Sequence, residues 1–81
     1  MKKVAVLIAA GSGMGASAAK TLAKEGYKIA IMSSSGKGEK LAKDLNGIGF
    51  TGSNLDPLEL KNFIDIVYKK WRRIDVLVNS A

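Results

Sequence analysis

Residues 4–15 read VAVLIAAGSGMG, and this stretch decides the fold of the 81-residue chain. The apolar run over residues 3–10 is rich in branched side chains, which is typical of a strand buried on both faces of a parallel sheet. A glycine cluster then breaks the run, and from Ala16 to Ala23 apolar residues recur at helical spacing. The stretch therefore predicts a strand, a glycine-rich turn and a helix.

The same alternation recurs along the rest of the chain. Short apolar runs at residues 28–32, 48–51 and 76–78 predict three further strands. A helix is expected over residues 37–46, and another begins at Asp56-Pro57, with Asp as the N-cap and Pro at the first helical position. The order β-α-β-α-β-α-β predicts an α/β fold: a doubly wound parallel sheet with right-handed crossovers and helices on both faces.

The composition limits the possible classes of protein. The chain has 47% hydrophobic and 25% charged residues and is short enough for one domain at most. It has no Cys and no His, which excludes a disulfide scaffold and a Cys/His zinc site. No apolar run approaches the roughly 20 residues of a membrane span, so no membrane partner is expected. The basic start resembles that of a signal peptide, but a glycine cluster follows directly; the cytoplasm is the expected location.

The net charge of +6 raises the possibility of a polyanionic partner. The basic residues are dispersed, and the one cluster, residues 69–73, lacks the interleaved aromatic residues of a stacking platform. Cations at a helix end also complement the macrodipole. We therefore expect no nucleic-acid partner; salt-dependent binding to generic DNA would support that alternative. A positive field would also help to attract an anionic cofactor.

The glycine cluster is a candidate phosphate-binding loop. It follows a strand and opens a helix, the context that gives a glycine pattern its weight. Its backbone lets a pyrophosphate approach the helix amides, and Met14 is expected to donate an amide while its side chain packs. A nucleoside-triphosphate loop is excluded because Gly15 is followed by Ala16-Ser17. The alternative is a plain glycine-rich turn. The predicted dinucleotide contacts are Ala9, Gly11, Ser12, Gly13, Met14 and Gly15.

The end of the second strand indicates which dinucleotide is bound. A carboxylate usually stands about 20 residues after the glycines, where it holds the adenosine ribose. Ser33 occupies that place, and nothing between Glu25 and Glu39 is acidic. Hydroxyl groups and an ammonium suit a 2′-phosphate, so Ser33, Ser34, Ser35 and Lys37 favour NADP over NAD. The alternative is that the serines simply form a turn.

These motifs together resemble the N-terminal part of a short-chain dehydrogenase/reductase, over essentially all 81 residues. The family's Thr-Gly-x-x-x-Gly-x-Gly loop corresponds to residues 8–15, with Ile8 and Ala9 in place of its Thr and Gly. Its Asn-Asn-Ala-Gly signature corresponds to residues 79–81, with Ser80 for the second Asn. The resemblance implies a Rossmann-type sheet. It also implies contacts to the adenine and ribose from Asn54, Leu55, Asn79 and Ala81. Asn79 as a strand-end cap is the alternative.

The resemblance also implies an activity, namely hydride transfer between NADP(H) and a small carbonyl or alcohol, with 3-oxoacyl thioesters among the candidates. The family's Tyr-x-x-x-Lys pair is absent, since Tyr27 and Tyr68 are followed four residues later by Ile31 and Arg72. Both tyrosines are interpreted as packing residues, and no catalytic residue is expected in the chain.

We therefore expect residues 1–81 to be the N-terminal dinucleotide-binding portion of a single Rossmann-type domain that continues beyond residue 81. The intact protein is expected to be an oxidoreductase and a homo-oligomer, either a dimer or a tetramer. A non-catalytic dinucleotide-binding or regulatory module is the alternative from a different class.

Overall fold

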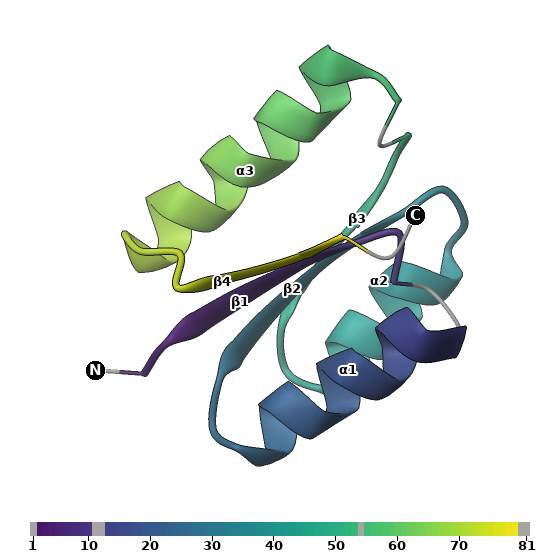
Figure 1. Ribbon diagram of the computed structural model, residues 1–81. Coiled ribbons are helices and arrows are strands. Elements are labelled where there is room, and N and C mark those ends of the chain that lie inside the picture. The colour runs from purple at the N-terminus through teal and green to yellow at the C-terminus, as the bar shows by residue number, and fades with distance from the viewer. Residues whose placement is uncertain (1, 11–12, 54, 80–81) are drawn as a thin grey trace.

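The alternation of strands and helices is confirmed. A computed structural model of the chain describes residues 2–10, 13–53 and 55–79. Its elements follow one another in the predicted order (Figure 1), with these bounds: β1 (Val4–Ile8), α1 (Gly13–Lys24), β2 (Lys28–Ser33), α2 (Lys37–Asp44), β3 (Ile48–Thr51), α3 (Pro57–Trp71) and β4 (Val76–Asn79).

The four strands form one parallel sheet in the order β3-β2-β1-β4. The chain steps from β1 to β2 and β3 in one direction and then returns to place β4 on the other side of β1. At the ends of the strands, Ile8 pairs with both Met32 and Asn79, and Ser33 pairs with Thr51. The sheet is thus doubly wound, and its strand order reverses between β1 and β4.

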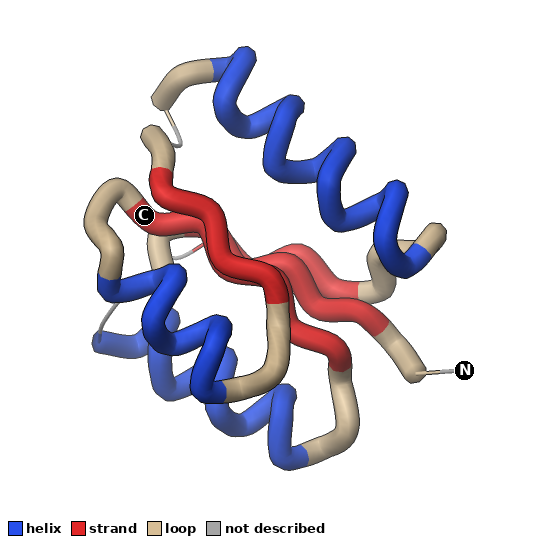
Figure 2. Tube along the Cα trace, turned by 180° about the vertical axis from the view of Figure 1, so that it is seen from behind, coloured by secondary structure: helices blue, strands red, loops and turns tan. Residues whose placement is uncertain are grey.

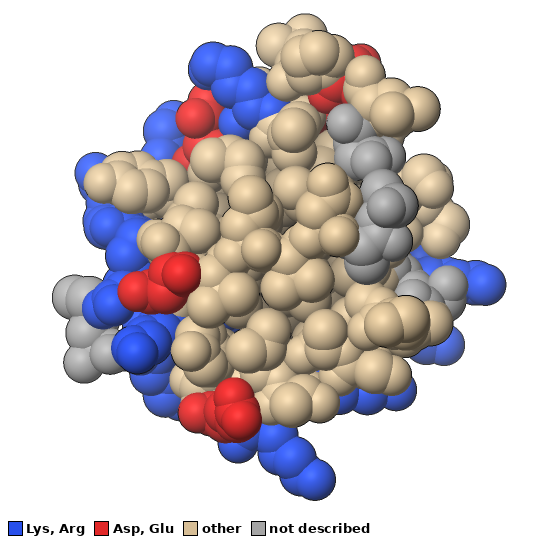
Figure 3. All heavy atoms as spheres, viewed as in Figure 1, with Lys and Arg blue, Asp and Glu red and all other residues tan. Residues whose placement is uncertain are grey.

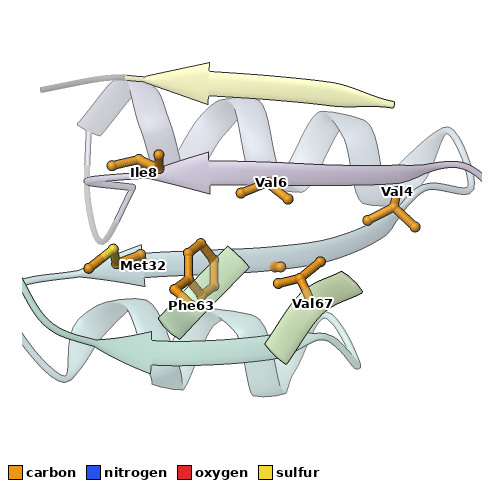
Figure 4. Packing of buried hydrophobic residues seen from close by; sticks show 7 residues of the cluster. Val4, Val6, Ile8, Met32, Phe63 and Val67 are labelled. Atoms are coloured by element: carbon orange, nitrogen blue, oxygen red, sulfur yellow. The ribbon is translucent and has the colours of Figure 1, made fainter. Parts of the chain in front are cut away.

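Helices cover both faces of the sheet, with α1 and α2 on one side and α3 on the other (Figures 1 and 2). All five residues of β1 are buried, as a central parallel strand requires. On the α3 face the buried side chains pack together (Figure 4), and they are Val4, Val6, Ile8, Ala30, Met32, Phe63 and Val67. On the opposite face the buried cluster includes Ala5, Leu7, Ile29, Ile31 and Ala42.

Several element ends differ from the sequence prediction. The first strand ends at Ile8 rather than at residue 10, because Ala9 has a φ of 64° and leaves the extended conformation. The helix expected over residues 37–46 ends at Asp44, since Asn46 adopts a left-handed φ of 58°. The predicted start of α3 is confirmed, with Pro57 as its first residue and the Asp56 side chain accepting from the amides of the first turn.

The packing role expected of the two tyrosines holds for one of them. Tyr27 is half-buried and packs against the core on the α1 and α2 face. Tyr68 instead lies on the outer side of α3 and is 52% exposed. The interpretation of Tyr68 as a packing residue was therefore wrong, because the stripe of α3 that faces the sheet runs through Phe63 and Val67.

Candidate functional site

The candidate site lies at the edge of the sheet where the four strands end (Figure 1). Parallel strands place their carboxyl ends together, so the segments that follow β1, β2, β3 and β4 converge there. In open α/β sheets, ligands bind outside this edge where the strand order reverses. The predicted site residues that the structure describes here are Ala9, Gly13, Met14, Gly15, Ser33, Ser34, Ser35, Lys37, Leu55 and Asn79. The other four, Gly11, Ser12, Asn54 and Ala81, lie outside the described residues.

After β1 the backbone adopts the left-handed conformation at Ala9, before residues 11–12, and again at Gly13, after them. Ala9 has a φ of 64°, and its amide donates to the Met32 carbonyl oxygen at 2.7 Å. A left-handed backbone costs an L-residue other than glycine about 1 kcal/mol. Gly13 also has a φ of 64°, and no described atom lies within 4 Å of where its Cβ would stand. Ala9 therefore holds, under strain, a conformation that glycine adopts freely.

The N-terminus of α1 faces the same edge, because helices in this fold run antiparallel to the strands. The first turn of a helix presents amide groups without intrahelical partners, and its dipole favours an anion. The described first turn of α1 contains no acidic residue, and Gly15 is buried. The Met14 side chain is 88% exposed, so the expectation that it packs was wrong. It lies on the outward side of the helix start.

The serine loop after β2, residues 33–37, is shaped by its own hydroxyl groups. The Ser33 Oγ accepts from the Ser35 amide at 3.3 Å, and the Ser35 Oγ accepts from the Lys37 amide at 3.4 Å. Each hydroxyl still has its own proton to donate, which an anionic oxygen can accept. Ser34, Ser35 and Lys37 are exposed, whereas Ser33 is buried. The loop is thus a turn that also presents donors to solvent.

The turn between β3 and α3 is fastened to the serine loop. The Gly52 amide donates to the Ser33 carbonyl oxygen at 2.8 Å. The next amide, that of Ser53, donates to the Glu59 carboxylate at 2.8 Å, and the Leu55 amide donates to the Ser53 Oγ at 3.1 Å. Sequence reasoning missed Glu59. An acidic residue in the first turn of a helix that begins Asp-Pro is the signal that could have found it.

The positive charge gathers at the opposite edge of the sheet, where the strands begin. Nine basic residues lie there, against three acidic ones, Glu25, Asp44 and Asp75. The charges of the remaining four basic and four acidic residues cancel. Basic side chains accordingly line the left side in Figure 3, where the strands of Figure 1 start. The nine are Lys2, Lys3, Lys24, Lys28, Lys43, Lys69, Lys70, Arg72 and Arg73. The basic residues that are dispersed in the sequence therefore converge at the edge opposite to the candidate site.

The carboxyl group with a shifted pKa also lies at that opposite edge. Asp75 Oδ2 accepts from the Val4 amide at 2.7 Å, and the Arg73 guanidinium binds both of its carboxylate oxygens. The Arg73 hydrogen bonds, followed by that of Val4, lower the pKa of Asp75 to about 2. Because the Asp75 amide also donates to the Val4 carbonyl oxygen at 2.8 Å, this residue joins the starts of β1 and β4.

Other kinds of site are not indicated. Among the described residues, no helix is long and apolar enough to cross a membrane. Nor do His, Cys, Asp and Glu side chains in that part of the chain gather in a group of three that could hold a metal ion. A surface hollow of about 430 Å³ is lined by Lys20, Thr21, Ala23, Lys24 and Leu45, none of which is a predicted site residue.

Comparison with known proteins agrees with this fold. Residues 3–81 match the short chain dehydrogenase family. A 3-oxoacyl-[acyl-carrier-protein] reductase from Buchnera aphidicola is 36% identical, and the match covers 99% of this chain and 34% of the relative. A D-threitol dehydrogenase from Mycolicibacterium smegmatis is 38% identical, with coverage of 98% and 33%. The chain thus spans about a third of the length of these relatives.

Solved structures share the same arrangement. An actinorhodin polyketide ketoreductase with NADPH superposes with a TM-score of 0.90 at 27% identity, over 99% of this chain and 33% of that one. A 3-ketoacyl-(acyl-carrier-protein) reductase from Brucella melitensis, complexed with NADH, has a TM-score of 0.87 at 26% identity, over 93% and 32%. The sheet order, the glycine turn and the match over residues 3–81 show that this chain belongs to the short-chain dehydrogenase family.

Proposed function

We propose that the intact protein is an oxidoreductase that transfers hydride between NADP(H) and a small carbonyl or alcohol, and that residues 1–81 bind the cofactor. The observation that carries the proposal is the chemistry at the end of β2. Ser34, Ser35 and Lys37 are exposed there, and no acidic residue lies between Glu25 and Glu39. Hydroxyl and ammonium donors suit a 2′-phosphate, which a carboxylate at this position would repel.

The rest of the carboxyl edge fits a dinucleotide. The pyrophosphate would lie at the N-terminus of α1, beside the backbone of residues 9–15, where glycine lets an anion approach the amides. The adenosine would extend across the end of β2 toward Leu55, with Asn54, Asn79 and Ala81 as further predicted contacts. The described first turn of α1, without acidic residues, leaves its dipole available to the phosphates.

The cofactor supplies the hydride, and the groups that move the proton are expected outside residues 1–81. Relatives named for 3-oxoacyl reduction and for a polyol support a carbonyl or alcohol substrate, with 3-oxoacyl thioesters as one candidate. We also propose that these residues are the first part of a longer Rossmann-type domain. Leu77 on β4 is 60% exposed, and uncharged side chains cover the middle of the face shown in Figure 3, as expected of a strand that pairs with a further strand. We further propose that the intact protein is cytoplasmic and forms a homo-oligomer.

The test is the affinity of the intact protein for NADPH and NADH, measured by isothermal titration calorimetry. We expect tighter binding of NADPH. Lys37→Glu should weaken NADPH binding by roughly tenfold and leave NADH binding nearly unchanged, because the lost contact is a charge-assisted bond to the 2′-phosphate. Lys43→Glu makes the same charge change at the far end of α2 and serves as the control. Equal or tighter binding of NADH by the unaltered protein would refute the preference for NADP.

A second candidate is a non-catalytic dinucleotide-binding or regulatory module. It is favoured by Ile8 and Ala9, which stand where the family has Thr and Gly, and by the strain at Ala9. The two candidates differ in the intact chain: the oxidoreductase needs a Tyr-x-x-x-Lys pair and oxidises NADPH with a carbonyl substrate. Cofactor binding without that pair and without turnover would establish the module instead.

A further inference from the structure

The β3–α3 turn presents a large apolar side chain at the candidate site. The described residues of the turn are Gly52, Ser53, Leu55 and Asp56, and Leu55 is 86% exposed. The hydrogen bond from the Gly52 amide to the Ser33 carbonyl oxygen joins this turn to the serine loop. The two segments proposed to contact the adenosine are therefore held together, and the position of one depends on the other.

Glu59 holds this turn from the first turn of α3. Its carboxylate accepts from the Ser53 amide at 2.8 Å in a half-buried setting. Ser53 organises the rest of the turn, because its Oγ accepts from the Leu55 amide and its carbonyl oxygen accepts from the Asp56 amide, both at 3.1 Å. A hydrogen bond to a carboxylate is stronger than one between neutral groups, so this contact stabilises the position of Ser53.

The contact is not needed to cap α3. In the usual capping box, an acidic residue at this helix position returns to the amide of the N-cap residue itself. Here Asp56 caps the helix alone, accepting from the amides of Leu58 and Glu59. The Glu59 carboxylate reaches past the cap to Ser53 instead. Its role lies in the shape of the turn.

Gly52 provides independent support for the role of Glu59 in the shape of the β3–α3 turn. A Cβ added at this position would overlap Glu59 Oε2, so the absence of a side chain is what lets the carboxylate lie against the turn. Glu59 and Gly52 thus form one arrangement: the first supplies the acceptor and the second leaves the space for it.

We propose that Glu59 is a positioning residue for the adenosine end of the cofactor. It acts through the Ser53 amide, which holds the β3–α3 turn and its Leu55 side chain beside the serine loop. This inference rests on the proposed cofactor-binding function. Without the acceptor, the turn samples other conformations in the free protein, and the cofactor must order it on binding at a cost in affinity.

The test uses the intact protein and adenosine 2′,5′-bisphosphate, which carries the adenosine end of NADP without the nicotinamide. Affinity is measured by calorimetry well below the unfolding temperature, with the melting temperature recorded in parallel. Glu59→Ala should weaken binding on the order of tenfold. Glu59→Gln keeps an oxygen acceptor and should restore most of the affinity. The control is Lys61→Ala, which removes an exposed ion pair with Asp65 on the same helix.

Gly52→Ala provides a second, independent variant should Glu59→Ala fold poorly. Its methyl group should displace the carboxylate and weaken binding in the same way. The methyl would also press on Phe50 Cε1, at 2.8 Å, so a lower melting temperature is expected. Because both changes break one arrangement, the double variant should bind little worse than Glu59→Ala alone. Fully additive losses would contradict the proposed coupling.

The outcomes separate this inference from the proposed function. An unaltered protein that binds neither NADPH nor the bisphosphate contradicts the proposed function, and the inference fails with it. An unaltered protein that binds both, together with a Glu59→Ala variant of unchanged affinity, overturns only the role of Glu59. A lower melting temperature at unchanged affinity would show that Glu59 serves stability alone.

Discussion

Gly38 tests how tightly the serine loop is held against the sheet. It is the second residue of α2 and is buried against the end of β2. A Cβ at this position would stand 2.5 Å from Ser33 Cβ and 3.1 Å from Ile31 Cγ2. Ser33 Cβ is attached directly to the backbone and cannot rotate away. In Gly38→Ala, α2 and the end of β2 must therefore separate by about 1 Å to restore ordinary van der Waals contact.

The expected cost follows from this overlap. Overpacking of this kind typically costs about 1–3 kcal/mol, and the better helix propensity of Ala offsets up to about 1 kcal/mol of it. We expect Gly38→Ala to lose about 1–2 kcal/mol of unfolding free energy. Ser33 ends β2 and Lys37 begins α2, so the separation of these two elements should also move the groups that are proposed to bind the 2′-phosphate. A movement of about 1 Å should lower the affinity for NADPH by about tenfold.

The assay is urea unfolding of the intact protein, followed by NADPH titration below the transition. The matched control is Gly36→Ala in the same loop. Gly36 has a φ of −64°, and no described atom lies within 4 Å of its Cβ position. The control should therefore change stability by less than about 0.5 kcal/mol. If Gly38→Ala matches the control in both stability and NADPH affinity, the close contact between α2 and Ser33 is refuted.

Three further predictions concern stability. Ala9→Gly should relieve the left-handed strain and raise the unfolding free energy by about 1 kcal/mol in urea, and a loss of stability would contradict the strained turn. Phe63→Ala removes the largest fully buried side chain and should cost about 3–5 kcal/mol by the same assay, against less than about 0.5 kcal/mol for the exposed Lys61→Ala. The folded pKa of Asp75, about 2, lies below its usual 3.8. The ionised Asp75 therefore stabilises the fold fully above about pH 4, and this stabilisation is lost as the pH falls toward 2. Asp75→Asn should flatten the dependence of the unfolding free energy on pH in this range. An unchanged dependence would show that the contacts of Asp75 with Arg73 and Val4 do not cause it.

Local patterns were enough to predict the elements and their order. Branched apolar runs and the Asp56-Pro57 helix start depend on nearby residues, and the structure has both where the sequence placed them. The predicted ends of the first strand and of α2 were wrong, because in each case a residue with a left-handed φ ends an element that the sequence pattern would extend. Ala9 continues an apolar run in sequence, yet its left-handed φ ends the strand before it. Asn46 shortens α2 in the same way.

The candidate site was predicted as a set of segments, while the links between them required the structure. The Glu59 contact with Ser53 depends on space left by Gly52, which no spacing rule encodes. The lysines that seem dispersed in sequence converge at one edge because the three helices all run antiparallel to the strands and end on the same side. Each helix carries basic residues in its last turn, which complement its dipole there.

We propose above that the carboxyl edge of this sheet holds NADP(H) with its 2′-phosphate against the serine loop. The most direct test is a crystal structure of the intact protein grown with NADPH. We expect the pyrophosphate at the N-terminus of α1 and the 2′-phosphate within hydrogen-bonding distance of Lys37 and the hydroxyl groups of residues 33–35. A cofactor bound with its 2′-phosphate away from this loop, or bound at the basic edge where the strands begin, would contradict the proposed NADP(H) site.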